Sequence, residues 1–235
     1  MLISSDYNFL FIHIPKVAGS SIENSLRRSI LSPWNKTNWQ IDIALRKLNH
    51  RAKFYSGLNF NLNNPLYNDP WQTIYDELGV RHALAKRIRT VLGQERYEAF
   101  FKFAFVRNPW ARLVSQYEYI LQTNHHGKRN HVKKLGSFES FIEDQATQRN
   151  INQAKWLVDD KNNLIVDYVG KLESIEKDYD FICEKLGINI PVKLSHSNRS
   201  QKRKGNSYRN YYSEYTKNLV YKSTQQDIEL FGYTF

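Results

Sequence analysis

Hydrophobic and polar positions divide the chain into short unbroken apolar runs and longer stretches with helical spacing. The runs at 9–14 and 101–106 are almost wholly apolar, and both end at a proline-containing turn. Runs of this length between turn signals predict buried strands. After the second run, apolar residues recur every three or four positions as Trp110, Leu113, Val114, Tyr117, Ile120 and Leu121, which predicts a helix. Pro109 suits the first turn of that helix.

The same spacing predicts further elements along the chain. We expect a strand over 164–169 and helices over 80–93, from Phe138 onward, through Cys183 and over 213–235. Strands that alternate with helices indicate an α/β fold. We therefore predict an α/β domain with a mainly parallel central sheet flanked by helices, which the phosphate-binding turn and the family resemblance described below make P-loop-like. Its ligand should lie at the carboxyl ends of strands 9–14 and 101–106.

Composition limits the domain count and the class of partner. With 235 residues, 41% of them hydrophobic, the chain can bury one sizeable core, so we expect a single domain over residues 1–235. The formal charge of +11 predicts an anionic partner, which could be a nucleic acid, an acidic membrane surface, a nucleotide or an acidic polysaccharide.

Location can also be predicted from the sequence. Cys183 is the single cysteine, so an internal disulfide is excluded, and its amphipathic surroundings predict a buried helix position. No apolar run approaches the roughly 18 residues of a membrane helix. The first predicted strand begins too early for a signal peptide to precede it, which favours a cytoplasmic protein.

The first predicted strand leads into a turn that suits a phosphate. Lys16, Gly19, Ser20 and Ser21 separate the strand from the next predicted helix. Backbone N–H groups at such a loop and helix start converge on one point, and the lysine adds a full positive charge. Alternatively, Ser20 and Ser21 merely cap the helix while Lys16 is solvated. The loop differs from G-x-x-x-x-G-K-[ST], because Lys16 precedes the glycine.

A second candidate phosphate site follows the second predicted strand. Arg107 ends that strand, and Ser115 follows eight residues later on the next predicted helix. Ser115, Arg112 and Tyr119 should all lie away from the apolar stripe of that helix. The planar guanidinium of arginine can give a phosphate two parallel hydrogen bonds. Arg107 and Ser115 could therefore face one ligand, although each alone is compatible with a surface residue.

Both motifs resemble those of one enzyme family. The segment 13–21, His-Ile-Pro-Lys-Val-Ala-Gly-Ser-Ser, resembles the 5'-phosphosulfate loop of sulfotransferases that use 3'-phosphoadenosine 5'-phosphosulfate (PAPS), most closely the carbohydrate-type (family 2-like) branch. Arg107-Asn108-Pro109 with Ser115 resembles the 3'-phosphate motif of the same family.

This resemblance implies a donor site and a reaction. It implies binding of PAPS, and of its product 3',5'-diphosphoadenosine (PAP), by Pro15, Lys16, Val17, Ala18, Gly19, Ser20, Ser21, Arg107 and Ser115. A late basic loop, with Arg199 and Lys202, is similar to the family's loop over the 3'-phosphate. The acceptor would be a hydroxyl of a glycan or glycolipid, with an amine or a small-molecule natural product as alternatives.

The general base is predicted among seven histidines. His82 should begin the helix over 80–93, where the helix dipole keeps imidazole neutral and able to accept a proton. Its place before the Arg-Asn-Pro strand also resembles the catalytic histidine region of glycan sulfotransferases. His50 is the rival candidate, and a solvent-facing His82 without a role is the alternative. His125, His126 and His131 could form a metal cluster, but we favour a basic loop at the acceptor entrance.

Three other functions stay open at this point. A nucleotide kinase would share the loop but would need a shifted lysine and a magnesium site, and no carboxylate follows a predicted strand in the expected position, so we predict no metal. A nucleic-acid-binding protein would explain the charge of +11, although we do not expect nucleic acid as the partner. A catalytically silent sulfotransferase-like scaffold is the third. The oligomeric state cannot be derived from the sequence.

Overall fold

The computed structural model describes residues 1–4, 6–30, 82–148, 151–188 and 207–235. The strands are β1 (Leu2–Ser4), β2 (Phe9–Ile12), β3 (Phe101–Val106) and β4 (Tyr168–Lys171). The helices are α1 (Gly19–Ile30), α4 (Ala85–Leu92), α5 (Gln94–Ala99), α6 (Pro109–Gln122), α7 (Arg129–Leu135), α8 (Phe138–Ala146), α9 (Ile175–Lys185), α10 (Glu214–Ser223) and α11 (Gln225–Phe231). Short 3₁₀ turns cover Ala154–Trp156, Leu172–Ser174 and Tyr208–Tyr211.

The described strands form one mainly parallel sheet in the order β1-β2-β3-β4. β1 pairs antiparallel with β2, whereas β2, β3 and β4 run parallel to one another. Ile12 is opposite Ala104, and Val106 is opposite Lys171, so the carboxyl ends of these three strands share one edge. The predicted α/β class and mainly parallel sheet are confirmed.

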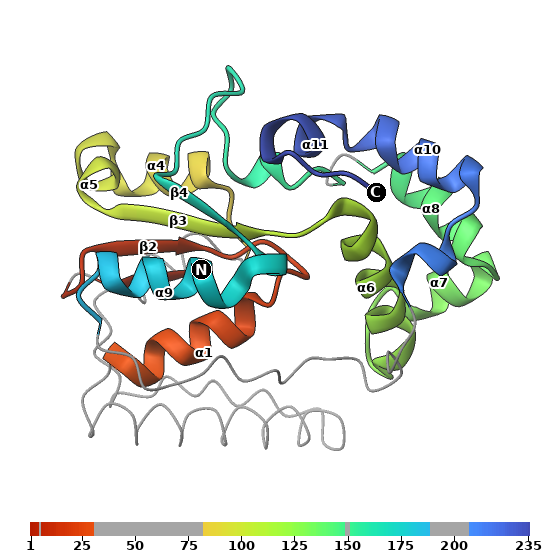
Figure 1. Cartoon of the computed structure of the whole chain (residues 1–235), viewed down its shortest axis with the longest axis horizontal. Coiled ribbons are helices and arrows are strands. Elements are labelled where there is room, and N and C mark those ends of the chain that lie inside the picture. Colours follow the sequence, from red (N-terminus) through yellow and green to blue (C-terminus); the bar gives the residue numbers. More distant parts are fainter. Residues whose placement is uncertain (5, 31–81, 149–150, 189–206) are drawn as a thin grey trace.

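Helices cover both faces of the sheet, and a separate group of helices stands at its carboxyl edge. Figure 1 shows α1 and α9 on one face and α4 and α5 on the other. β3 leads directly into α6, which packs with α7 and α8, while α10 packs on α8. The helix group therefore stands where the parallel strands end, which is the edge at which α/β proteins bind ligands.

Two clusters of buried apolar side chains hold these parts. One surrounds the sheet and includes the fully buried Phe9, Phe11, Phe103 and Phe105. The other joins the helices at the carboxyl edge and centres on Trp110, Phe141 and Ile142. Ile228 packs against both clusters.

Several predicted elements need correction. The strand predicted over 164–169 is β4, Tyr168–Lys171, because Leu164 instead bridges Val158 and Ile165 N–H donates to Leu157. The helix predicted over 80–93 begins only at Ala85, so His82 precedes it rather than beginning it. The segment 213–235 holds two helices, which are separated at Thr224.

Two other predictions concern single features. Cys183 is fully buried in α9, as predicted, and burial raises the pKa of its thiol to about 11. Within the described residues, no helix is both long enough and apolar enough to span a membrane.

Candidate functional site

The turn between β2 and α1 has an unusual backbone. Lys16 and Ala18 have φ values of 69° and 59°, in the left-handed region, while Val17 between them does not. Residues other than glycine adopt this region at a cost of about 1–2 kcal/mol each, and such strain clusters at ligand sites. Backbone that alternates in hand turns successive N–H groups toward one point and forms an anion-binding concavity.

The backbone of this turn also forms the first hydrogen bonds of α1. The N–H groups of Ser21 and Ile22 donate to the carbonyl of Ala18 at 2.8 and 3.1 Å. Ser21 is buried, and the helix itself already uses its backbone N–H. The sequence predicts that backbone N–H groups of residues 17–21 hold a phosphate, and because the N–H of Ser21 is used within the helix, we assign this role to residues 17–20.

A buried histidine lies under the turn. His13 Nδ1 lies 3.2 Å from Oε2 of Glu23, and both side chains are buried. The His13 ring packs against Gly19 so closely that a Cβ at Gly19 would lie 2.0 Å from His13 Cδ2. Burial lowers the pKa of His13 to about 4, so the ring is neutral near pH 7 and donates from Nδ1 to the carboxylate. His13 is thus structural, as its alternation with apolar neighbours suggests.

His82 lies at the carboxyl end of β2. Its Nδ1 is 2.8 Å from the carbonyl oxygen of His13, and the two rings meet edge to face with centroids 4.6 Å apart. Since a carbonyl oxygen only accepts hydrogen bonds, Nδ1 of His82 must carry the proton. The neutral ring then has its basic lone pair on Nε2, the tautomer that a general base requires. The His13 carbonyl thus sets the tautomer of His82, which precedes α4 rather than beginning it.

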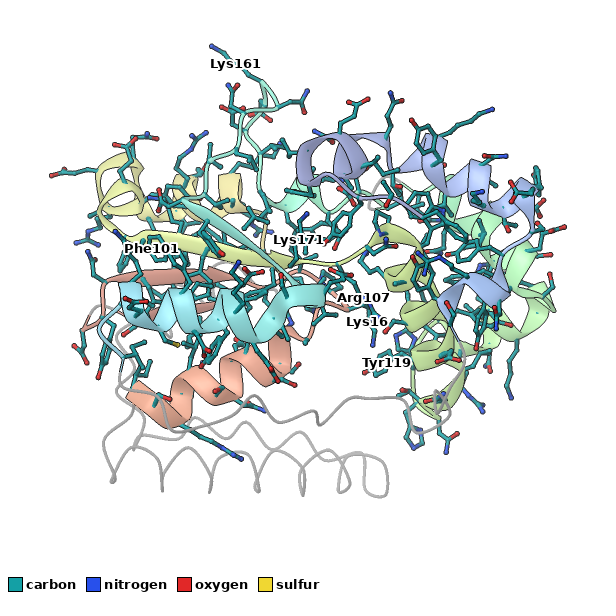
Figure 2. All side chains as sticks on the ribbon, viewed as in Figure 1. Lys16, Phe101, Arg107, Tyr119, Lys161 and Lys171 are labelled. Atoms are coloured by element: carbon teal, nitrogen blue, oxygen red, sulfur yellow. The ribbon has the colours of Figure 1, made fainter. Side chains whose placement is uncertain are left out.

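Lys16 connects the turn to α6. Its Nζ lies 3.6 Å from the centre of the Tyr119 ring, and Figure 2 shows Arg107, Lys16 and Tyr119 along the side of α6 that faces the sheet. Ser115 is four residues before Tyr119, so the two share a face of the helix. The face of α6 that carries Ser115 therefore lies opposite the Lys16 turn. This is the arrangement expected if the turn and this face of α6 bind one ligand between them.

Arg107 follows β3 and is held by its backbone. Its N–H donates to Oε1 of Gln153 at 2.9 Å, and its carbonyl accepts from Nε2 of Gln153 at 2.7 Å. Gln153 is fully buried, and Asp227 accepts from both its backbone N–H and its Nε2. The start of α6 is fixed in turn by Asn108, whose side chain accepts from Ala111 N–H. The strand end that carries Arg107 is thus rigidly placed.

Arg112 is not the outward-facing residue that the helical pattern indicates. It is 2% exposed, and its Nη2 donates to the carbonyl of Ile151. Burial lowers its pKa, while the carboxylate of Asp227 opposes that shift. The buried carboxylate accounts for a cation in the core, since an uncompensated buried charge is strongly destabilising. Arg112 therefore supports the fold around Gln153.

Lys171 adds a further cation to the carboxyl edge of the sheet. It ends β4 beside Val106, and its Nζ lies 5.0 Å from the centre of the Tyr233 ring. Tyr233 donates to Glu173, which also accepts from Asn108 N–H. Burial raises the pKa of Tyr233, and Glu173 adds to the rise. The parallel order of three strands brings their carboxyl ends together and is the signal that places Lys171 near the site.

Other predicted residues lie elsewhere. Arg199, Lys202 and His50 are outside the described residues. His125 and His126 lie between α6 and α7, and His131 on α7 pairs with Asp144 at 3.0 Å. In the part of the chain that the structure describes, no cluster of three or more His, Cys, Asp or Glu side chains could hold a metal. The absence of a metal requirement stays a prediction.

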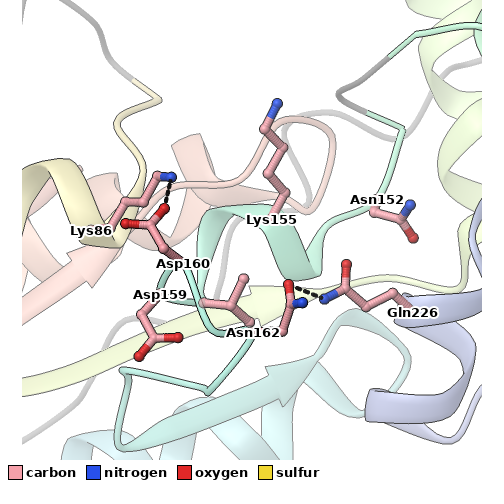
Figure 3. Close-up of a pocket in the computed structure, with 8 residues that line it drawn as sticks. Lys86, Asn152, Lys155, Asp159, Asp160, Asn162 and Gln226 are labelled. Carbon is pink, nitrogen blue, oxygen red and sulfur yellow. Dashed lines mark hydrogen bonds and ion pairs between the residues drawn. The ribbon is translucent and has the colours of Figure 1, made fainter.

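A hollow of about 250 Å³ lies apart from these residues, between α4, the 158–164 loop and α11 (Figure 3). Its lining mixes two lysines with two aspartates, and Lys86 pairs with Asp160 at 2.6 Å. The lining therefore has no net charge to favour an anion. The predicted donor residues do not line it.

Comparison with known proteins identifies one family. The sequence model of the sulfotransferase family matches residues 1–234. A protein of Archaeoglobus fulgidus, described as uncharacterized, is 29% identical over 102 residues, which cover 43% of this chain and 79% of that protein. No solved structure matches.

Proposed function

Because this chain belongs to the sulfotransferase family, we propose that it transfers a sulfuryl group from PAPS to an acceptor hydroxyl. Family membership supports sulfotransfer in general. The observation that carries the PAPS donor is the meeting of the Lys16 turn with the Ser115 face of α6, since these are the segments that resemble the two phosphate motifs. We assign this activity to one domain, residues 1–235.

The donor would bind along the carboxyl edge of the sheet. Backbone N–H groups of residues 17–20 would hold the 5'-phosphate oxygens, where α1 begins and its dipole favours negative charge. Arg107 and Ser115 would hold the 3'-phosphate, with Arg199 and Lys202 closing over it. A 3'-phosphate distinguishes PAPS from ATP, so Arg107 would set the choice of nucleotide.

The transfer step would be an in-line displacement at sulfur. The acceptor oxygen forms a bond to sulfur while the bond between sulfur and the bridging phosphate oxygen breaks, and that oxygen keeps the electron pair as PAP leaves. Lys16 would stabilise the negative charge on the bridging oxygen. Nε2 of His82 would accept the proton from the acceptor hydroxyl, a role supported by the tautomer that the His13 carbonyl imposes. As in phosphoryl transfer, positioning and charge stabilisation supply most of the rate.

The acceptor is the less constrained part of the proposal. The loop and helix over 123–134 expose Lys128, Lys133 and Lys134, and His126 in this segment contacts the Tyr119 ring that lies against Lys16. Such a basic surface suits an acidic or polyhydroxylated molecule, so we propose a glycan or glycolipid. A small-molecule natural product is the alternative. A kinase, a nucleic-acid-binding protein and a silent scaffold are the competing functions.

The test is a transfer assay. The purified protein is incubated with PAPS carrying radioactive sulfur together with one acceptor pool at a time, of glycans, glycolipids or phenolic small molecules. The label transferred to each pool is then counted. We expect label on one pool, lost in Lys16→Ala and His82→Ala. Donor binding without transfer to any pool would favour the silent scaffold, whereas phosphate transfer from ATP would favour the kinase.

A further inference from the structure

Tyr119 is an exposed aromatic residue beside Lys16, the lysine that we assign to the donor. Its side chain is on α6 and 46% exposed, although its ring lies 3.6 Å from Nζ of Lys16. Large aromatic side chains gain stability by burial, so packing does not explain a ring that stays half in solvent. The contact with Lys16 offers another reason for the position of the ring.

The chemistry of this contact leaves the lysine able to act. A cation over an aromatic face is attracted by the ring quadrupole, and the ring accepts through its face without neutralising the charge. A carboxylate partner would instead cancel the charge and compete with a phosphate. The three N–H donors of an ammonium point in different directions, so a lysine on a ring face can still donate to an oxygen on its other side.

The ring itself is held in place by its neighbours. The imidazole of His126 meets it edge to face, with ring centroids 5.6 Å apart. Nδ1 of His126 accepts from Lys128 N–H at 3.1 Å, which fixes the imidazole. Burial lowers the pKa of His126, and the charges of Lys128 and Lys16 lower it further, which favours the neutral imidazole beside Lys16 near pH 7.

We propose that Tyr119 is a positioning residue that holds the Lys16 ammonium at the mouth of the donor site before the donor arrives. A free lysine side chain samples many rotamers, and binding must then select one of them. With the ring contact already formed, less of this freedom is lost when the phosphosulfate binds. The inference rests on the proposed function, because it assigns Lys16 to the donor.

The test is calorimetric titration with PAP of the wild type, Tyr119→Leu, Tyr119→Phe and Tyr221→Leu. Tyr221 is the matched control, since it is a similarly exposed tyrosine, 50%, on α10. We expect Tyr119→Leu to weaken PAP binding about two- to fivefold, the range that an exposed cation–π contact can supply. Tyr119→Phe keeps the ring face and should bind as the wild type does, as should Tyr221→Leu.

A double-mutant cycle separates positioning from a general effect on α6. In a Lys16→Ala background, Tyr119→Leu should leave PAP affinity unchanged, since the ring then has no ammonium to hold. A loss of equal size in both backgrounds would overturn the proposal, as would wild-type affinity in Tyr119→Leu alone.

The contact can also be measured without donor. In protein labelled with ¹³C-lysine, the ε-methylene protons of Lys16 should resonate upfield because of the ring current and lose this shift in Tyr119→Leu. If the shift is present but the wild type fails to bind PAP, the proposed function is wrong while the contact stands. If PAP binds and the shift is absent, the role of Tyr119 is wrong and the donor assignment stands.

Discussion

Replacing Gly19 by alanine should damage the turn because of one buried ring. A Cβ there would lie 2.0 Å from Cδ2 and 2.1 Å from Nε2 of His13, whereas carbon atoms in contact are about 3.5–4.0 Å apart. The His13 ring is 3% exposed, stacks on Phe11 and bonds to Glu23, so it has no space to retreat. The new methyl group must therefore displace either the ring or the start of α1.

The expected cost follows from two effects. Overpacking a buried site typically costs about 1–3 kcal/mol. Displacing the ring also weakens the hydrogen bond to Glu23, which leaves a buried carboxylate less satisfied at about 1–3 kcal/mol. We expect Gly19→Ala to lower the free energy of unfolding by about 2–6 kcal/mol in urea denaturation.

Two comparisons make the measurement decisive. Gly127→Ala places a methyl group where nothing lies within 4 Å, so it should change stability by less than about 1 kcal/mol. In a His13→Ala background, the cost of Gly19→Ala should fall below about 1 kcal/mol, because the obstructing ring is gone. Unchanged stability in Gly19→Ala, or an equal cost in both backgrounds, would refute the reasoning.

Three further predictions concern the proposed chemistry and the buried histidine. His82→Ala should lower sulfuryl-transfer turnover about 10²–10⁴-fold while PAP affinity stays within about twofold of the wild type, as measured by label transfer and calorimetry, and full turnover would exclude His82 as the base. Arg107→Ala should weaken PAP binding about ten- to hundredfold and leave ADP binding unchanged, and equal losses for both nucleotides would contradict a role at the 3'-phosphate. Because burial lowers the pKa of His13 from 6.5 to about 4, the unfolded chain binds more protons than the folded protein between these values. The free energy of unfolding, measured by urea denaturation, should therefore be highest above pH 6.5 and decrease toward pH 4. This decrease should be up to about 3 kcal/mol larger in the wild type than in His13→Gln, and parallel pH profiles of the two proteins would contradict this.

The parts of the fold that were predictable are those written in local patterns. The strand at 101–106 and the helix that follows it match β3 and α6, since an unbroken apolar run and a proline at the helix start act over a few residues. The strand predicted at 164–169 begins instead at Tyr168, because Leu164 and Ile165 pair with the chain at 157–158 and not with the sheet. Ile165 donates its N–H to Leu157 and accepts a hydrogen bond from Tyr97, which packs it without a place in the sheet.

The site was predictable as two separate segments, and its internal contacts were not. Lys16, Arg107 and Ser115 follow from strand, turn and helix order. The pairing of Lys16 with Tyr119 depends on how α6 stands against the sheet, which no local pattern encodes. Arg112 has helical spacing that favours exposure, and its burial depends on Asp227, which is distant in the sequence.

We propose that a PAPS-type nucleotide binds at the carboxyl edge of the sheet. Calorimetric titration of the purified protein with PAP, with ADP and AMP as controls that lack the 3'-phosphate, tests it most directly. We expect micromolar binding of PAP, in the ordinary range of enzyme ligands, and much weaker binding of ADP and AMP. Equal affinity for PAP and ADP would contradict it and would favour a nucleotide kinase or a nucleic-acid-binding protein.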